Sequence, residues 1–310
     1  MALGYLTKGP GRIGLGGRAW GRPGRRHPGV TMHLPLGPLA GPLGRDLRAS
    51  ALRDAAGVVA SLPEEGPVVG DADLAVLPAP AQRYLRFMGV VGRPRDRSFL
   101  VRFRGRFQRP GQPWMPCEAW QYNASHPICR AFHMRIDFAH VIPMVGHDTY
   151  LEGHGIMKGK VLGLVTVADG SGPELDIGEL VTYVNDAVVL APSMLLADAV
   201  TWGEVDDESF TITLTDRGNT VTAQVFTNPD GSLRDFATED RWYDGPDGLV
   251  RAKWTTPFDG WITTDDGPWL TGAQAVWDLP DGPLPYIEGT FDHESLIRNV
   301  APQTCLAGAA

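Results

Sequence analysis

A histidine–aspartate pair near the middle of the chain could carry out acid–base chemistry. His147 and Asp148 are adjacent, and His154 and Lys158 follow in a segment rich in glycine. The unperturbed pKa of an imidazole, about 6.5, lets it accept or donate a proton near neutral pH. We predict His147 or His154 as the acid–base residue, oriented by Asp148 or Lys158. The alternative interpretation is a solvated turn, because closely spaced glycines also suit a bulged hairpin.

Five histidines recur at intervals of seven residues, a spacing that could point to a metal site. They are His126, His133, His140, His147 and His154. Prolines and glycines between them exclude a helical heptad, and along one continuous strand an odd spacing would alternate between faces. Metal-binding patterns such as HExxH and CxxC are absent. We interpret the spacing as coincidence and predict no metal and no other cofactor, with a multi-histidine metal site as the alternative.

A further catalytic candidate, Asp186, lies in the clearest helical pattern of the chain, at residues 176–198. Asp176 and Glu179 form a capping-box pattern, apolar residues follow at helical spacing, and Pro192 predicts a kink. The apolar residues occur on most sides, so we expect a largely buried helix. A carboxylate in such a helix must find a partner or shift its pKa, unless that side of the helix faces solvent.

Aromatic and methionine side chains could line a pocket for a hydrophobic ligand. The chain beyond residue 96 holds eight tryptophans. A concave sheet lined by large apolar side chains suits an apolar ligand, with a few polar groups to orient it. The predicted ligand-binding residues are Trp120, Tyr122, Met134, Tyr150, Met157, Tyr183, Trp254 and Trp277. The alternative is that these side chains only pack the core and the rim of a barrel.

The elements that position these residues are mostly strands. Helices are predicted at residues 45–62 and 77–89, and from Ser98 onward the apolar residues alternate with polar ones, which is typical of a half-buried strand. Further strands are predicted at 118–123, 129–138, 149–153, 210–215, 221–226, 233–243, 249–256, 269–278 and 284–292. Strands on both sides of one buried helix predict a mainly β (α+β) fold, with a curved antiparallel sheet or open barrel of about ten strands wrapped around the central helix.

The sequence predicts a division into four parts. They are a basic tail at 1–44, helices packing on the barrel at 45–95, one ligand-binding domain at 96–300 with its helix at 176–198, and a disordered tail at 301–310. Three interpretations of the basic tail remain open: a disordered arm, a start codon assigned too early with translation beginning at Met32, and an export signal built on Arg25 and Arg26.

Charge and composition argue against several classes of protein. The net charge is −8, and residues 1–31 carry six basic residues and no acidic one, so the remainder is strongly acidic and poorly suited to nucleic acid. No apolar run approaches the length of about 18 residues that a membrane-spanning helix needs. Three cysteines are too few for a disulfide framework, which favours a reducing, cytoplasmic location. P-loop and GxSxG motifs are absent.

Several segments carry a resemblance to a known family. They are LPAPAQRYLRFMG, FRGRF, WQY, VGHDTYLEGHGIMKGKVLGLV, NDAVVLAPSMLL, VTW and AVWDLPDGPLPY, spread over Leu77–Val300. Together they resemble a bacterial family of unknown function that is similar in architecture to the half-barrel lipoprotein carriers LolA and LolB. Where that family would have Arg-Tyr-Leu-x-Glu on the central helix, this chain has Thr182, Tyr183, Val184 and Asp186. The resemblance implies a half-barrel fold and carries no catalytic signature.

Two functions from different classes fit these patterns. The first is a cofactor-independent cyclase or isomerase of specialised metabolism, which positions a flexible hydrophobic substrate and uses one or two acid–base groups. The second is a non-catalytic carrier for a lipid-like ligand, as the resemblance implies. A protein with a fully packed core and no ligand is the third interpretation. The sequence leaves the ligand and the oligomeric state open.

Overall fold

The computed structural model describes residues 46–62, 66–138, 142–162, 164–246 and 248–307. The helices are α1 (Leu47–Ala56), α2 (Asp71–Ala75), α3 (Ala79–Phe87), α4 (Pro173–Leu190) and α5 (Pro302–Ala307), with short 3₁₀ turns η2 (Pro192–Leu195) and η3 (His293–Ser295). The first strands are β1 (Ser98–Phe107), β2 (Met115–Ser125), β3 (Ile128–Phe138), β4 (Ile142–Leu151), β5 (His154–Val161) and β6 (Val165–Ser171). After α4 come β7 (Val200–Asp206), β8 (Ser209–Asp216), β9 (Asn219–Thr227), β10 (Leu233–Thr238), β11 (Trp242–Gly245), β12 (Gly248–Arg251), β13 (Lys253–Thr255), β14 (Phe258–Thr264), β15 (Gly267–Leu279), β16 (Gly282–Phe291) and β17 (Ile297–Arg298).

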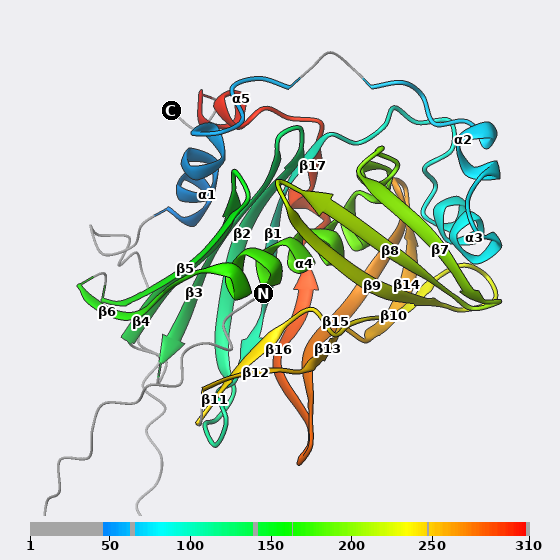
Figure 1. Ribbon diagram of the computed structural model, residues 1–310. Coiled ribbons are helices and arrows are strands. Elements are labelled where there is room, and N and C mark those ends of the chain that lie inside the picture. Colours follow the sequence, from blue (N-terminus) through cyan, green and yellow to red (C-terminus); the bar gives the residue numbers. More distant parts are fainter. Residues whose placement is uncertain (1–45, 63–65, 139–141, 163, 247, 308–310) are drawn as a thin grey trace, which may run out of the picture.

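Fifteen of the described strands form one large antiparallel sheet that curves around α4, as the sequence predicts (Figure 1), whereas β11 and β12 pair with each other as a separate two-stranded sheet. Its order is β6-β5-β4-β3-β2-β1-β16-β15-β13-β10-β9-β8-β7, with β14 added to β15 and β17 added to β1. Most neighbours in space are also neighbours in sequence. The pairing of β1 with β16 joins the two halves, and the path ends at β6 and β7 without closing, so the sheet is an open barrel.

The main core lies between the concave, inner face of the sheet and α4. Nearly every residue of α4 from Leu175 to Leu190 is buried, because the helix is covered by strands on several sides. Inward-facing Phe132 and Met134 of β3 belong to this core. The buried central helix is therefore confirmed, and it ends at Pro192, where a 3₁₀ turn follows.

A second, smaller core lies on the convex, outer face. There α1 packs on β2 and β3, and α5 packs beside α1 (Figure 1). Cys129 and Ala131 alternate along β3 with the inward-facing residues and belong to this outer core. Because the side chains of a strand alternate between its two faces, successive residues of β3 contribute in turn to the main core and to the outer core.

Some local predictions differ from the structure. The central helix begins at Pro173 after Gly172, so Asp176 and Glu179 lie within its first turns and do not cap it. Residues 302–307, expected in a disordered tail, form α5, because its Cys305 is buried against α1. The basic tail, residues 1–44, lies outside the described residues.

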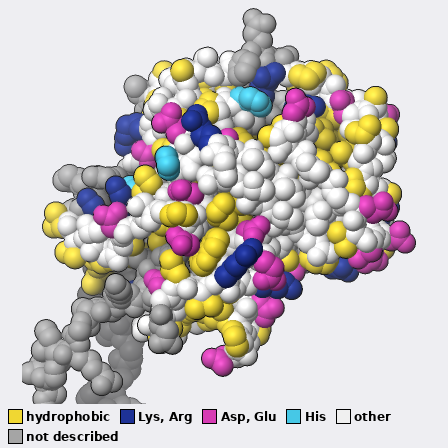
Figure 2. All heavy atoms as spheres, in the orientation of Figure 1, with side chains coloured by type: hydrophobic (Ala, Val, Ile, Leu, Met, Phe, Trp, Pro, Cys, Tyr) yellow, Lys and Arg dark blue, Asp and Glu magenta, His cyan; other side chains and the backbone are white. Residues whose placement is uncertain are grey.

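The visible surface in Figure 2 mixes acidic, basic and apolar side chains. Among the residues described, no helix combines the length and the apolar character needed to cross a membrane. A cytoplasmic location stays a prediction.

Candidate functional site

The two residues of the predicted histidine–aspartate pair point to opposite faces of the sheet. His147 is on the outer face of β4, close to Asp54 of α1. Asp148 is on the inner face, 1% exposed, where its charge acts on Glu179 of α4. The alternation of a strand prevents adjacent side chains from sharing a site. The two residues therefore belong to two different clusters.

The inner cluster is centred on Arg130 of β3, whose side chain is completely buried. Its Nη1 lies 2.8 Å from Oε2 of Glu179, and its Nε donates to Oδ2 of Asp186 at 2.7 Å. The same Asp186 oxygen accepts a hydrogen bond from Nε2 of Gln121. Glu179 and Asp186 are seven residues apart on α4, two helical turns, so both face β3. One arginine thus binds two carboxylates of the central helix.

The inner cluster holds more negative than positive groups. The carboxylates are Asp148, Glu179 and Asp186, and the guanidinium groups that act on them are Arg130 and Arg241. Burial is the main cause that raises the pKa of Glu179 to about 7, and the charge of Asp148 adds to it. Burial and the neighbouring carboxylate both disfavour the ionised form of Glu179, so this carboxyl group titrates near neutral pH.

Several polar atoms of the inner cluster are buried without a partner in the described part of the chain. Among the described residues, Oε1 of Glu179, Oε1 of Gln121, Nη2 of Arg130 and Nδ2 of Asn123 have no hydrogen-bond partner. Buried polar atoms are almost always satisfied in proteins, by protein, water or ligand. These atoms can therefore bind bridging water or a polar group of a ligand.

A small cavity adjoins the inner cluster, between α4 and strands β13 to β16. Its walls are mainly apolar and include Phe103, Trp254 and Phe291, while Asn185 and Asp186 contribute polar groups. Its volume is about 30 Å³, room for a water molecule or two. Asp186 thus connects the cavity to the Arg130 ion pairs.

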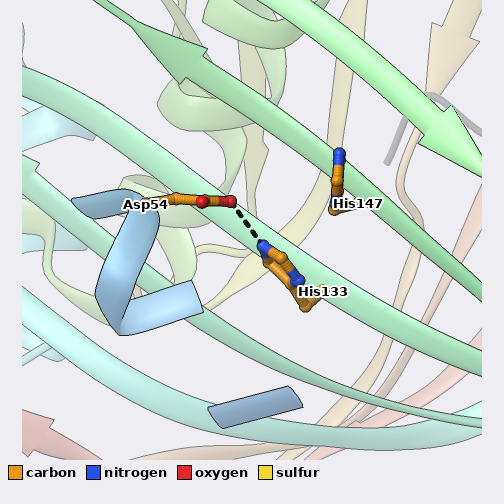
Figure 3. Close-up of side chains that lie close together, drawn as sticks. All are labelled: Asp54, His133 and His147. Atoms are coloured by element: carbon orange, nitrogen blue, oxygen red, sulfur yellow. Dashed lines mark hydrogen bonds and ion pairs between the residues drawn. The ribbon is translucent and has the colours of Figure 1, made fainter. Parts of the chain in front are cut away.

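The outer cluster consists of Asp54, His133 and His147 (Figure 3). Nε2 of His133 lies 2.7 Å from Oδ2 of Asp54, and the two imidazole rings are 4.9 Å apart on paired strands. Burial lowers the pKa of His147, and the neighbouring His133 adds to this effect. Burial alone would raise the pKa of Asp54, but the hydrogen bond and the charge of His133 hold this pKa below its usual value.

Comparison with known proteins identifies the family of the chain. Residues 67–289 match the model of DUF6544, described as a family of unknown function. The chain belongs to the DUF6544 family. The predicted resemblance to a family of unknown function is thereby confirmed. None of the curated proteins matches the chain significantly.

A solved structure of a LolA superfamily protein from Nitrosomonas europaea is similar to this DUF6544 chain. The sequences are 12% identical, the TM-score is 0.40, and the match covers 75% of this chain and 98% of that one. The residues of the inner cluster lie within the DUF6544 match, whereas Asp54 of the outer cluster precedes it.

The structure separates the predicted ligand-binding residues of the DUF6544 chain into two groups. Met134, Tyr150, Met157, Tyr183, Trp254 and Trp277 lie in the main core around α4. Trp120 and Tyr122 pack in or against the outer core, on the other side of the sheet. They cannot line the same cavity as Trp254, because the sheet lies between them.

The predicted catalytic residues are also separated. Asp186 and Asp148 are in the inner cluster and His147 is in the outer one. His154 belongs to neither, since its side chain is 76% exposed and its Nδ1 lies 3.8 Å from Asp176. Asp176 in turn accepts a hydrogen bond from the backbone of Gly155.

Arg130 and Glu179 are not among the site residues predicted from the sequence, although a signal for each is present there. Arg130 is two residues before Phe132 and four before Met134, so it must share their inward face. Glu179 is seven residues before Asp186 and therefore shares its helix face. A charged residue on an otherwise apolar strand face is the pattern that could have found the ion pair.

Proposed function

We propose that this DUF6544 protein binds a small, largely apolar molecule in the cavity beside Asp186. The observation that carries the proposal is that Asp186 of a buried charge cluster lines an apolar cavity, while other polar atoms of the cluster have no hydrogen-bond partner among the residues that the structure describes. Ligand sites are typically apolar clefts with a few polar groups that fix orientation. Asp186 would orient the ligand by accepting a hydrogen bond from it.

The polar end of the ligand would be a hydrogen-bond donor. Asp186 lines the cavity as an acceptor, and Nδ2 of its neighbour Asn185 is already engaged by Oγ1 of Thr256 at 2.7 Å. Phe258, Leu270 and Ile287 offer apolar contact, and Gln274 is a further polar residue of the wall. A hydroxyl or amine on a hydrocarbon skeleton fits this arrangement.

The cavity must enlarge to admit such a ligand. Pockets for drug-sized molecules usually measure about 300–1,000 Å³, whereas this cavity measures about 30 Å³. Apolar side chains at the cavity walls, such as Phe258 and Phe291, would have to move apart. Binding would then be accompanied by a change in the environment of the adjoining Trp254.

Native mass spectrometry of the purified full-length chain, compared with denaturing mass spectrometry, tests the proposal. We expect a co-purifying apolar compound on the wild type and on Trp120→Leu, whose altered side chain is on the outer face. Trp254→Leu should lose the compound. The proposal fails if the wild type carries nothing and a panel of lipids and polyketides neither shifts its melting temperature nor changes its tryptophan fluorescence.

A second candidate function is catalysis by a cofactor-independent cyclase or isomerase. The observation that favours it is the pKa of Glu179, about 7, in a cluster that shares Arg130 with the cavity residue Asp186. Groups that titrate near neutral pH suit proton transfer. Asp186 would contact the substrate, and Glu179 would tune it through Arg130.

The two candidates predict different behaviour for one variant. Asp186→Asn should retain a bound apolar compound but stop its conversion if the protein is an enzyme. For a carrier, wild type and variant would both release the compound chemically unchanged. The comparison uses the compound recovered from the native mass spectrometry and its linear precursor.

A further inference from the structure

We propose that Asp54, His133 and His147 form a binding site for a divalent transition-metal ion. The site would be on the convex face of the sheet, under α1, and is separate from the cavity around α4. One side-chain ligand atom from each residue lies within 4.8 Å of the others. The proposal does not depend on the proposed ligand-binding function.

The three residues come from elements that the fold places together. His133 and His147 are directly opposite each other on the paired strands β3 and β4, on the same face. Asp54 reaches them from α1, which packs over β3 (Figure 3). Because the strands fix both imidazoles, two of the three ligands are held by rigid elements.

The donor set is that of a zinc-type site. Two imidazole nitrogens and one carboxylate oxygen bind Zn²⁺ at about 2.0–2.2 Å, and three protein ligands leave a fourth position for water. The side chain of Asp54 is 38% exposed, so it can swing from its hydrogen bond with His133 toward an ion. The ion would take the place of the hydrogen bond that now joins the two side chains.

A purely structural role explains only part of this cluster. The hydrogen bond between His133 and Asp54 can fasten α1 to the sheet. The strand register places the ring of His147 4.9 Å from that of His133, but within the described residues no hydrogen bond gives the imidazole of His147 a structural role. A shared metal ion gives both imidazoles a role.

A nearby cation should limit the affinity of the site. Lys158 of β5 is the cross-strand partner of His147, on the same outer face, and Asp169 of β6 is the partner of Lys158. The charge of Lys158 would repel a metal ion beside His147. Removing that charge should therefore strengthen metal binding, an effect that misfolding cannot produce.

Calorimetric titration of the metal-free, full-length chain with ZnCl₂ tests the site. We expect one Zn²⁺ per chain, binding at least tenfold more weakly to His147→Asn and Asp54→Asn and more tightly to Lys158→Gln. His154→Asn is the matched control, because His154 is on the same sheet but outside the cluster. The zinc affinity of this variant should equal that of the wild type.

A CoCl₂ titration adds a spectroscopic measurement. Co²⁺ bound by two imidazoles, a carboxylate and water should give the strong visible absorption of a four-coordinate ion, and His147→Asn should lose it. Thermal unfolding verifies that each variant is folded. Equal zinc affinity of wild type and His147→Asn, or no zinc binding to the wild type, would overturn the proposal.

Discussion

Nη1 of Arg130 lies 2.8 Å from Oε2 of Glu179, and neither side chain is exposed to solvent. This ion pair joins β3 to the middle of the sheet's central helix. A buried ion pair adds little net stability, because both charges lose their hydration, but removing one partner leaves the other uncompensated. The pair therefore makes the docking of α4 depend on charge as well as on apolar packing.

Replacing Arg130 tests this dependence. Arg130→Met should lower the free energy of unfolding by about 3–5 kcal/mol, because Glu179 and Asp186 would remain buried without their cation. Urea denaturation measures the change. Arg135→Met is the control on the same strand, since Arg135 faces outward and its ion pair with Asp137 is partly exposed. We expect it to cost no more than about 1 kcal/mol, and an equal loss in the two variants would contradict the role given to Arg130.

The titration of Glu179 predicts how stability varies with pH. Its pKa is raised from 4.5 in the unfolded chain to about 7 in the folded protein, mainly by burial. Between these values the folded state holds a proton that the unfolded chain has released, so the stability contributed by this group falls as pH rises. The decline should amount to a few kcal/mol between pH 4.5 and pH 7.

The variant Glu179→Gln isolates this effect from other titrating groups. Glutamine mimics the protonated acid at every pH, so the wild type should lose stability relative to Glu179→Gln as the pH rises toward 8. Urea unfolding at several pH values gives the difference. A constant difference between the two proteins from pH 5 to pH 8 would show that Glu179 does not titrate in this window.

Close packing at the start of α4 should make Gly155 intolerant of a side chain. A Cβ added at this residue would lie 2.2 Å from the backbone oxygen of Leu175. Gly155→Ala should therefore destabilise the protein by about 1–3 kcal/mol through forced shifts in the helix. At Gly260 of β14 the nearest atom would be 3.5 Å away, an ordinary contact. A thermal melt of Gly260→Ala should consequently resemble that of the wild type.

The hydrogen bond between Asp54 and His133 should control local opening of α1. Asp54→Ala removes it, at a cost of about 1–2 kcal/mol, which corresponds to an opening population roughly 5–30 times larger. Cys129 lies buried beneath α1, and burial raises the pKa of its thiol, so the folded protein protects it from alkylation. Mass spectrometry after iodoacetamide treatment should show faster labelling of Cys129 in this variant.

Arg53→Ala is the control for that labelling experiment, because Arg53 is on the same helix and its side chain is exposed. Its labelling rate should match the wild type. If Asp54→Ala and the wild type react at the same rate, α1 is held by apolar packing alone.

Local patterns in the sequence predicted much of the architecture. Alternating apolar residues indicated most of the strands, including β1 and β3, and an apolar pattern on most sides indicated the buried helix α4. The sequence left two environments open for Asp186, a buried one and one facing solvent, and the structure shows the buried one, because that residue is 3% exposed. These features depend on residues near one another in the chain, and the periods of strand and helix are enough to show them.

Partners across the fold were decided only by the tertiary structure. The sequence placed His147 and Asp148 in one site, whereas the pleat of β4 sends them to separate clusters with Asp54 and with Glu179. It also grouped Trp120 with Trp254, which lie on opposite sides of the sheet. The period of a strand determines which residues share a face, but the order and register of distant strands, and the helix that covers each face, determine what those residues meet.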